Sequence, residues 1–215
     1  MTNLTLTPKN QEVPLPPAPA LPFTVKADTK QYLKSLGPAR IILALGITIV
    51  FWVRLGPLGW LISVVSIAAL ITLIIFMLTR REITVNNEGV HFKNSFGITK
   101  STKFDEIEAA QILDNYVDPG FGAMPRIMVA KKSGGVAFSI IGIFWPYEGM
   151  TQLLSALRSK KVPLNFYIDQ IQSAQVAKEF PELVPFYERH PYWVAAISVV
   201  VIFAGVAAGV LLFVM

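Results

Sequence analysis

The chain has 215 residues, of which 53% are hydrophobic and only 15% are charged, and its formal net charge is +5. An ordinary soluble domain carries roughly 25% charged residues, so this composition argues against a purely soluble protein and favours membrane insertion. The chain contains no Cys, which excludes disulfides and thiolate metal sites.

A Pro-rich arm occupies residues 1–36. Its segment 14–22 reads PLPPAPALP, which favours the extended polyproline II conformation with little backbone self-pairing. Such an arm would be disordered alone, so an ordered arm would indicate that something holds it, most simply a large partner. The candidate docking residues in the arm are Pro14, Pro16, Pro17, Pro19 and Pro22.

Two apolar runs follow within residues 37–80. The run 41–53 has about 13 residues, fewer than the roughly 20 that cross a bilayer, whereas the run 57–79 has about 23 uncharged residues. Gly56 and Pro57 break the helix between the two runs. The pattern therefore predicts a transmembrane helical hairpin.

Charged residues predict how this hairpin is oriented. Lys26, Lys30, Lys34 and Arg40 precede the first run, Arg80 and Arg81 follow the second, and only Arg54 lies in the turn. The positive-inside rule then places the N-terminus and the middle of the chain in the cytoplasm, in a multi-pass protein of the plasma membrane.

Residues 81–162 read as short strands followed by one helix. The predicted strands are EITVNN, VHFKNSF, TKSTKF, IEAAQILDN, RIMVAKK and VAFSIIGIF, and residues 116–125 are a predicted Gly- and Pro-rich loop. After Pro146, Met150, Leu153, Leu154 and Leu157 have the spacing of one apolar helix face.

This middle segment resembles the pleckstrin-homology (PH) domains that accompany a pair of transmembrane helices in bacterial membrane proteins. The resemblance rests on ITVNNEGVHFKNSFG, KFDEIEAAQ, MVAKKSGGVAF and FWPYEGMTQLLSALRSKK, and it covers about 80 residues plus the preceding hairpin. It implies a bent antiparallel sheet closed by one C-terminal helix. The Pro-rich arm and a third apolar run depart from the commonest layout of such proteins.

The remaining chain is a predicted amphipathic linker, residues 163–191, with a surface helix over 166–180, and a C-terminal transmembrane helix, residues 192–215. The C-terminus would then lie outside the cell. Gly205 and Gly209 form a GxxxG pattern, in which small residues let membrane helices approach closely.

Charged residues of the middle segment supply further candidate sites. In KFDEIE, Phe104 and Ile107 are expected to point inward, and Asp105, Glu106 and Glu108 face water as a candidate docking patch for a basic partner. The candidate contacts to anionic lipid headgroups are Lys93, Lys100 and Lys103.

Motifs for catalysis are missing from the sequence. It has no HExxH, GxSxG, P-loop or dinucleotide glycine pattern, and its two histidines, His91 and His190, are far apart. Asp114, Asp118 and Arg126 are the one polar cluster that an enzyme could use. No cofactor, metal, nucleic acid or small-molecule substrate is expected.

The favoured hypothesis is a non-catalytic accessory subunit of a larger bacterial membrane complex, whose PH-like domain mediates protein contacts. The resemblance to small actinobacterial membrane subunits suggests hosts such as the cytochrome bcc–aa3 respiratory supercomplex or the envelope-biogenesis machinery. The alternative is a membrane-surface module that binds anionic lipid through the PH-like domain.

Overall fold

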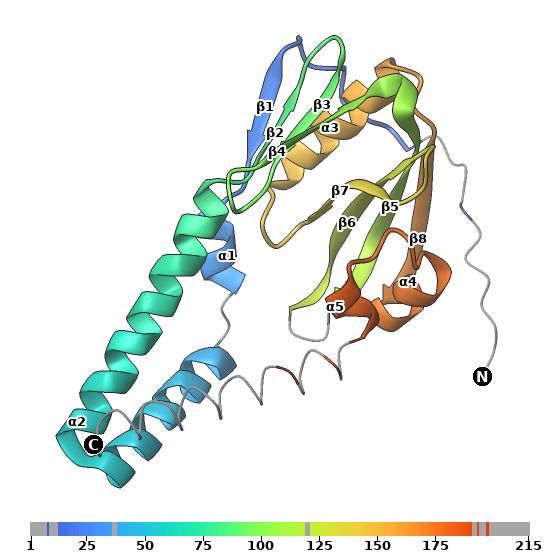
Figure 1. The fold of residues 1–215 in the computed structure, drawn as a ribbon. Helices are drawn as coiled ribbons and strands as arrows, with labels where there is room; N and C mark the ends of the chain where they lie inside the picture. The colour runs from blue at the N-terminus through green and yellow to red at the C-terminus, as the bar shows by residue number, and fades with distance from the viewer. Residues whose placement is uncertain are drawn as a thin grey trace.

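The computed structural model describes residue 8 and residues 13–35, 38–118, 121–190, 193 and 197. Within these ranges the chain forms two four-stranded sheets, one long apolar helix and several shorter helices (Figure 1). The predicted C-terminal span, including Gly205 and Gly209, lies outside the described residues apart from positions 193 and 197.

The first sheet is antiparallel and has the strand order β1-β2-β3-β4. Its strands are β1 (Phe23–Lys26), β2 (Glu82–Val85), β3 (Gly89–Lys93) and β4 (Thr99–Lys103). Strand β1 comes from the arm, and it pairs with β2 although residues 27–81 separate the two strands in the sequence. The side chains of Val13, Leu15 and Leu21 also pack on the core, and Arg158 Nη1 donates a hydrogen bond to the Val13 carbonyl at 3.0 Å. The part of the arm from residue 13 onward therefore packs on the chain's own core and first sheet.

Helix α1 (Thr29–Ser35) is short, and α2 (Pro38–Thr79) is long and apolar. Gly56 divides α2 because its φ of 64° and ψ of −152° are non-helical, and the chain reverses there (Figure 1). Among the described residues, Trp52–Thr79 is the stretch long and apolar enough to cross a membrane, with a mean hydropathy of 2.9. Only 11% of its most apolar window is buried.

The second sheet has the strand order β7-β6-β5-β8. Its strands are β5 (Ile107–Asp118), β6 (Gly122–Lys131), β7 (Val136–Ile141) and β8 (Leu164–Gln172). The 3-10 helix η1 (Phe104–Glu106) carries the chain from β4 into β5, between the sheets. Strand β8 runs parallel to β5, whereas the other pairs are antiparallel, so the expectation of a wholly antiparallel sheet is wrong at this edge.

Most elements predicted within residues 81–162 are confirmed, with two corrections along the chain. The loop predicted over residues 116–125 is wrong, because β5 continues to Asp118 and β6 begins at Gly122. The helix predicted over residues 166–180 is wrong in its first half, which forms β8. This part of the predicted linker therefore lies in a sheet.

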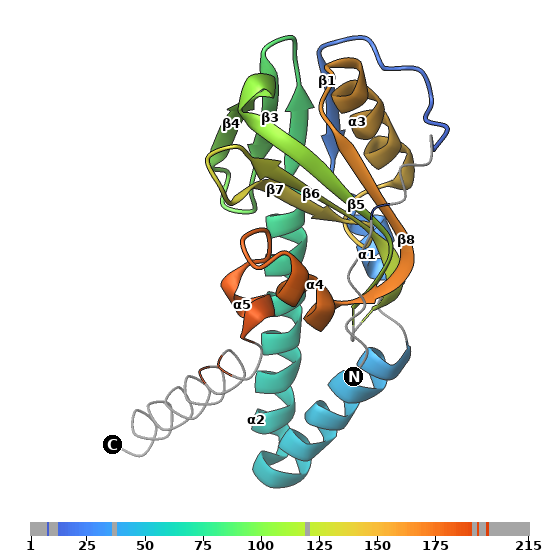
Figure 2. The same cartoon turned by 90° about the vertical axis from the view of Figure 1, so that its right-hand side faces the viewer.

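Helices cover both faces of the second sheet (Figure 2). Helix α3 (Tyr147–Ser159) packs Met150, Leu153 and Leu157 into the larger core, which both sheets share. Helices α4 (Ser173–Glu179) and α5 (Phe186–Arg189) follow β8, and this region closes a smaller core on the opposite face. We call the two sheets with α3, α4 and α5 the sheet domain. Its second sheet is buried on both faces, which explains the nearly continuous apolar run RIMVA in β6.

Candidate functional site

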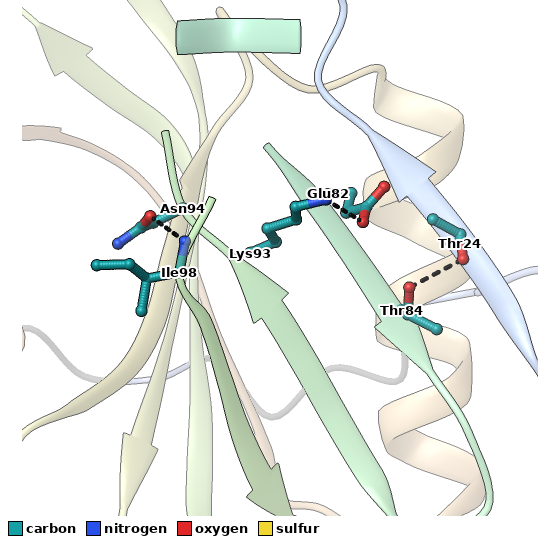
Figure 3. Close-up of polar contacts among 6 residues, drawn as sticks. All are labelled: Thr24, Glu82, Thr84, Lys93, Asn94 and Ile98. Atoms are coloured by element: carbon teal, nitrogen blue, oxygen red, sulfur yellow. Dashed lines mark hydrogen bonds and ion pairs between the residues drawn. The ribbon is translucent and has the colours of Figure 1, made fainter. Parts of the chain in front are cut away.

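The three candidate lysines do not converge on one site. Lys93 in β3 forms an ion pair with Glu82 at 3.2 Å (Figure 3). Lys100 and Lys103 are exposed on β4, where Lys100 is paired in register with Phe92 and Lys103 with Gly89. Lys93 and Lys100 therefore lie toward the α2 end of the first sheet, whereas Lys103 lies at its opposite end.

The apolar helix joins the sheet domain through a short, well-bonded junction, which comprises residues 79–82 and the β3–β4 turn, residues 94–98. Arg80 places its guanidinium 4.0 Å from the centre of the Phe76 ring. Arg81 donates from Nε to Ser95 Oγ at 2.5 Å, and its carbonyl accepts the Ala27 N–H at 3.1 Å. The junction thus couples the end of α2 to both the arm and the first sheet.

A mixed-charge groove is formed around η1 and the residues that follow α3. These segments lie at the end of the first sheet that is remote from α2 (Figure 1). The groove has a volume of about 430 Å³ and is lined by Phe104, Asp105, Ile107, Glu108, Lys132, Lys160, Lys161, Val162 and Pro163. Asp105, Glu106 and Glu108 are exposed while Ile107 is buried and Phe104 half-buried, as the sequence predicts. The predicted acidic patch therefore borders three lysines.

Arg126 is a functional candidate whose environment the sequence did not reveal. The guanidinium is fully buried inside the sheet domain and forms a bidentate pair with Glu188 of α5, with Nη1–Oε2 at 2.6 Å and Nη2–Oε1 at 3.2 Å. Its Nε also donates to Ser139 Oγ at 3.3 Å, and the Tyr116 ring centre lies 4.8 Å away. We call this contact the Arg126–Glu188 clamp, because it ties α5 to the second sheet.

The structure separates two members of the polar cluster considered for catalysis, Asp114 and Arg126. Asp114 is exposed and lines a small cavity beneath the arm and α3, together with Ile112 and Met150, on the face opposite α5. Arg126 is turned toward α5 instead. Burial raises the pKa of Tyr116 to about 12, although Arg126 opposes this shift. A phenol with so high a pKa keeps its proton at neutral pH.

The histidines have structural contacts. His91 bonds through Nδ1 to Ser101 Oγ at 2.7 Å and through Nε2 to Asn86 Nδ2 at 3.0 Å, which ties together β3, β4 and the β2–β3 turn. The His190 ring packs on Phe186 with the ring centres 4.7 Å apart. Across the part of the chain that the structure describes, no three His, Cys, Asp or Glu side chains are grouped so that they could hold a metal ion.

The docking prolines lie along the surface of the sheet domain. Pro14, Pro16, Pro17 and Pro22 are exposed and Pro19 is half-buried, while Leu15 and Leu21 between them pack on the core. Comparison with protein-family models, with curated proteins and with solved structures gives no match. Function therefore has to be inferred from the residues of this chain.

Proposed function

We propose that the chain is a membrane-anchored, non-catalytic accessory subunit that holds its sheet domain against the cytoplasmic face of the plasma membrane. The observation that carries this proposal is the exposure of the apolar segment Trp52–Thr79, of which little is buried within the chain. Exposed apolar surface is unfavourable in water by about 25 cal/mol per Å², so a helix of this kind requires a covering. A bilayer provides that covering for a segment of this length.

The bend at Gly56 supports a helical hairpin in the bilayer. Trp52 and Trp60 are both exposed beside the bend, as residues of an aromatic belt are at the membrane interface. Arg80 and Arg81 lie at the other end of the apolar segment, next to the sheet domain. This distribution supports a cytoplasmic sheet domain with the bend on the outer side. A C-terminal span would then return the chain outward.

The order of elements in the sheet domain supports its resemblance to a PH domain. Strands β2, β3 and β4 lie in one sheet and β5, β6 and β7 in the other, and the helix α3 follows. Three features go beyond the resemblance: β1 is supplied by the arm, β8 adds a parallel edge, and α4 and α5 cover the outer face. We infer a PH-like scaffold that has been extended at both ends of its chain.

The mixed-charge groove is the proposed contact site for cytoplasmic parts of a host complex. It lies away from α2, so a membrane-anchored sheet domain would present it to the cytoplasm. Exposed Asp105 and Glu108 would face basic groups of the partner, and Lys160 and Lys161 would face acidic ones. The proposed hosts are a respiratory supercomplex of the cytochrome bcc–aa3 type or envelope-biogenesis machinery.

Gentle solubilisation of native membranes, followed by pull-down of this chain, tests the accessory role. We expect integral membrane proteins to be recovered in fixed stoichiometry with the wild-type chain. The double variant Asp105→Lys/Glu108→Lys should lose them, whereas the control Glu182→Lys, at an exposed acidic residue elsewhere, should retain them. Recovery of the wild-type chain as a lone monomer or homodimer would contradict the proposal.

Lipid binding is a second candidate function, which the basic residues near the junction support. Arg80 and Lys100 are exposed near the end of α2, and each cation near an anionic membrane contributes about 1 kcal/mol. This function predicts that anionic lipids are enriched around the chain in nanodiscs and that this enrichment decreases as the salt concentration rises. Equal lipid enrichment for the wild type and for the variant Arg80→Gln/Lys100→Gln would exclude it.

A further inference from the structure

The β3–β4 turn, residues 94–98, presents two large apolar side chains that the protein leaves uncovered. Phe96 is 73% exposed and Ile98 is 59% exposed. Val136, at the start of β7, is exposed to only 38%. Phe96 and Ile98 are two residues apart in one turn, and we call this exposed pair the apolar tip.

Four backbone N–H groups of this turn, those of Asn94, Phe96, Gly97 and Ile98, donate hydrogen bonds within the turn. The side chain of Asn94 accepts the N–H of Phe96 at 2.9 Å. It also accepts the N–H of Ile98 at 3.0 Å (Figure 3). The Asn94 carbonyl accepts the Gly97 N–H at 3.0 Å, and Gly97 has the φ of +80° that a tight turn of this kind requires. Unpaired N–H groups are costly in lipid, so the internal bonding of these four donors suits the turn to the membrane interface.

The apolar tip lies directly beside the end of the apolar helix. Arg81 bonds to Ser95 at 2.5 Å, and a Cβ built on Gly97 would lie 3.9 Å from the Arg80 guanidinium. The pairing of Glu82 with Lys93 brings the start of β2 and the end of β3 together at this level. In Figure 1 the β3–β4 turn accordingly lies next to the end of α2.

We propose that Phe96 and Ile98 insert into the interfacial layer of the same bilayer that α2 enters. This inference rests on the membrane anchoring proposed above, and lipid is its occupant because the turn is continuous with the end of the apolar helix. The headgroup layers add roughly 5 to 8 Å on each side of the hydrocarbon core, which is deep enough to receive two side chains. The tip and α2 together would fix the tilt of the sheet domain on the membrane.

Single-cysteine spin labelling tests the insertion without background labelling, because the chain has no Cys. The variants Phe96→Cys and Ile98→Cys are compared with Val136→Cys, at the opposite end of the sheet domain, and with Thr72→Cys, within the apolar segment. Each full-length chain is reconstituted in nanodiscs of phosphatidylcholine and phosphatidylglycerol. Power-saturation electron paramagnetic resonance then compares the accessibility of each label to oxygen, which concentrates in lipid, and to a water-soluble nickel chelate.

We expect the oxygen-to-nickel ratio to be highest at position 72, intermediate at positions 96 and 98, and lowest at position 136. A ratio at positions 96 and 98 equal to that at 136, while position 72 stays in lipid, overturns the insertion and leaves the membrane anchor standing. A strongly immobilised label at position 96 that neither reagent reaches indicates a protein contact, and this result also overturns it. A water-like ratio at position 72 overturns the anchoring itself.

Discussion

Removal of the carboxylate from the Arg126–Glu188 clamp should strongly destabilise the sheet domain. In the variant Glu188→Ala, Arg126 keeps its bond to Ser139 but loses both bonds to the carboxylate. Breaking a buried ion pair by removal of one partner costs about 3–5 kcal/mol, because the remaining charge is uncompensated. The Glu188 side chain is 13% exposed and α5 is short, so some water can reach the guanidinium once α5 loosens. We therefore expect the free energy of unfolding to fall by about 3 kcal/mol, the lower end of this range.

The assay is urea unfolding of the full-length chain in detergent micelles. It is followed by the near-ultraviolet circular dichroism of the aromatic side chains, which include the buried Trp145. Glu182→Ala is the matched control, because this exposed acidic residue precedes α5. The double variant Arg126→Met/Glu188→Leu removes both charges and should come within about 1 kcal/mol of the wild type, since an apolar pair of similar volume replaces the ion pair.

Hydrogen exchange adds a local readout for the same variants. Glu188→Ala should speed amide exchange in α4 and α5 more than in β2 and β3, because the clamp ties α5 to the second sheet. The reasoning is refuted if Glu188→Ala loses no more stability than Glu182→Ala, or if the double variant is less stable than Glu188→Ala.

Two further predictions concern Tyr116 and the arm. The raised pKa of Tyr116, about 12, means that the folded state holds this proton more tightly than the unfolded chain, whose phenol has a pKa of 10.0. The protonated phenol therefore stabilises the fold fully below about pH 10, and this contribution, on the order of 2 kcal/mol, is lost between about pH 10 and pH 12. In urea titrations across this range, the free energy of unfolding should fall less for Tyr116→Phe than for the wild type. A Cβ on Gly149 of α3 would lie 2.3 Å from Val25 of β1, so Gly149→Val should destabilise the chain by about 1–3 kcal/mol and expose the arm to protease after Lys26. If the variant is protected from protease as well as the wild type is, β1 does not pack against Gly149.

Local patterns in the sequence predict those elements whose partners are close along the chain. The turn NNEG joins β2 to β3, and the glycines after Lys132 join β6 to β7, so short-range turn chemistry sets these pairings. The inward direction of Ile107 likewise follows from strand alternation. The spacing of apolar residues after Pro146 predicts α3 for the same reason.

Such local patterns do not predict pairings between segments that are far apart in the sequence. Strand β1 offers only the four residues FTVK, and its partner β2 lies beyond the whole of α2. The first half of residues 166–180 is predicted as helix, yet pairing with β5 makes it the strand β8. The clamp joins residues 62 apart, and no local signal connects Arg126 with Glu188.

The central claim, a membrane anchor with a cytoplasmic sheet domain, is tested most directly by cysteine accessibility in intact cells. Ser133→Cys lies in the exposed β6–β7 turn of the sheet domain, and Arg54→Cys lies beside the bend of α2. Each single-cysteine chain is treated with a membrane-impermeant maleimide before and after permeabilisation. We predict that position 54 reacts in intact cells and that position 133 reacts only after permeabilisation. Labelling of position 133 in intact cells would contradict the account.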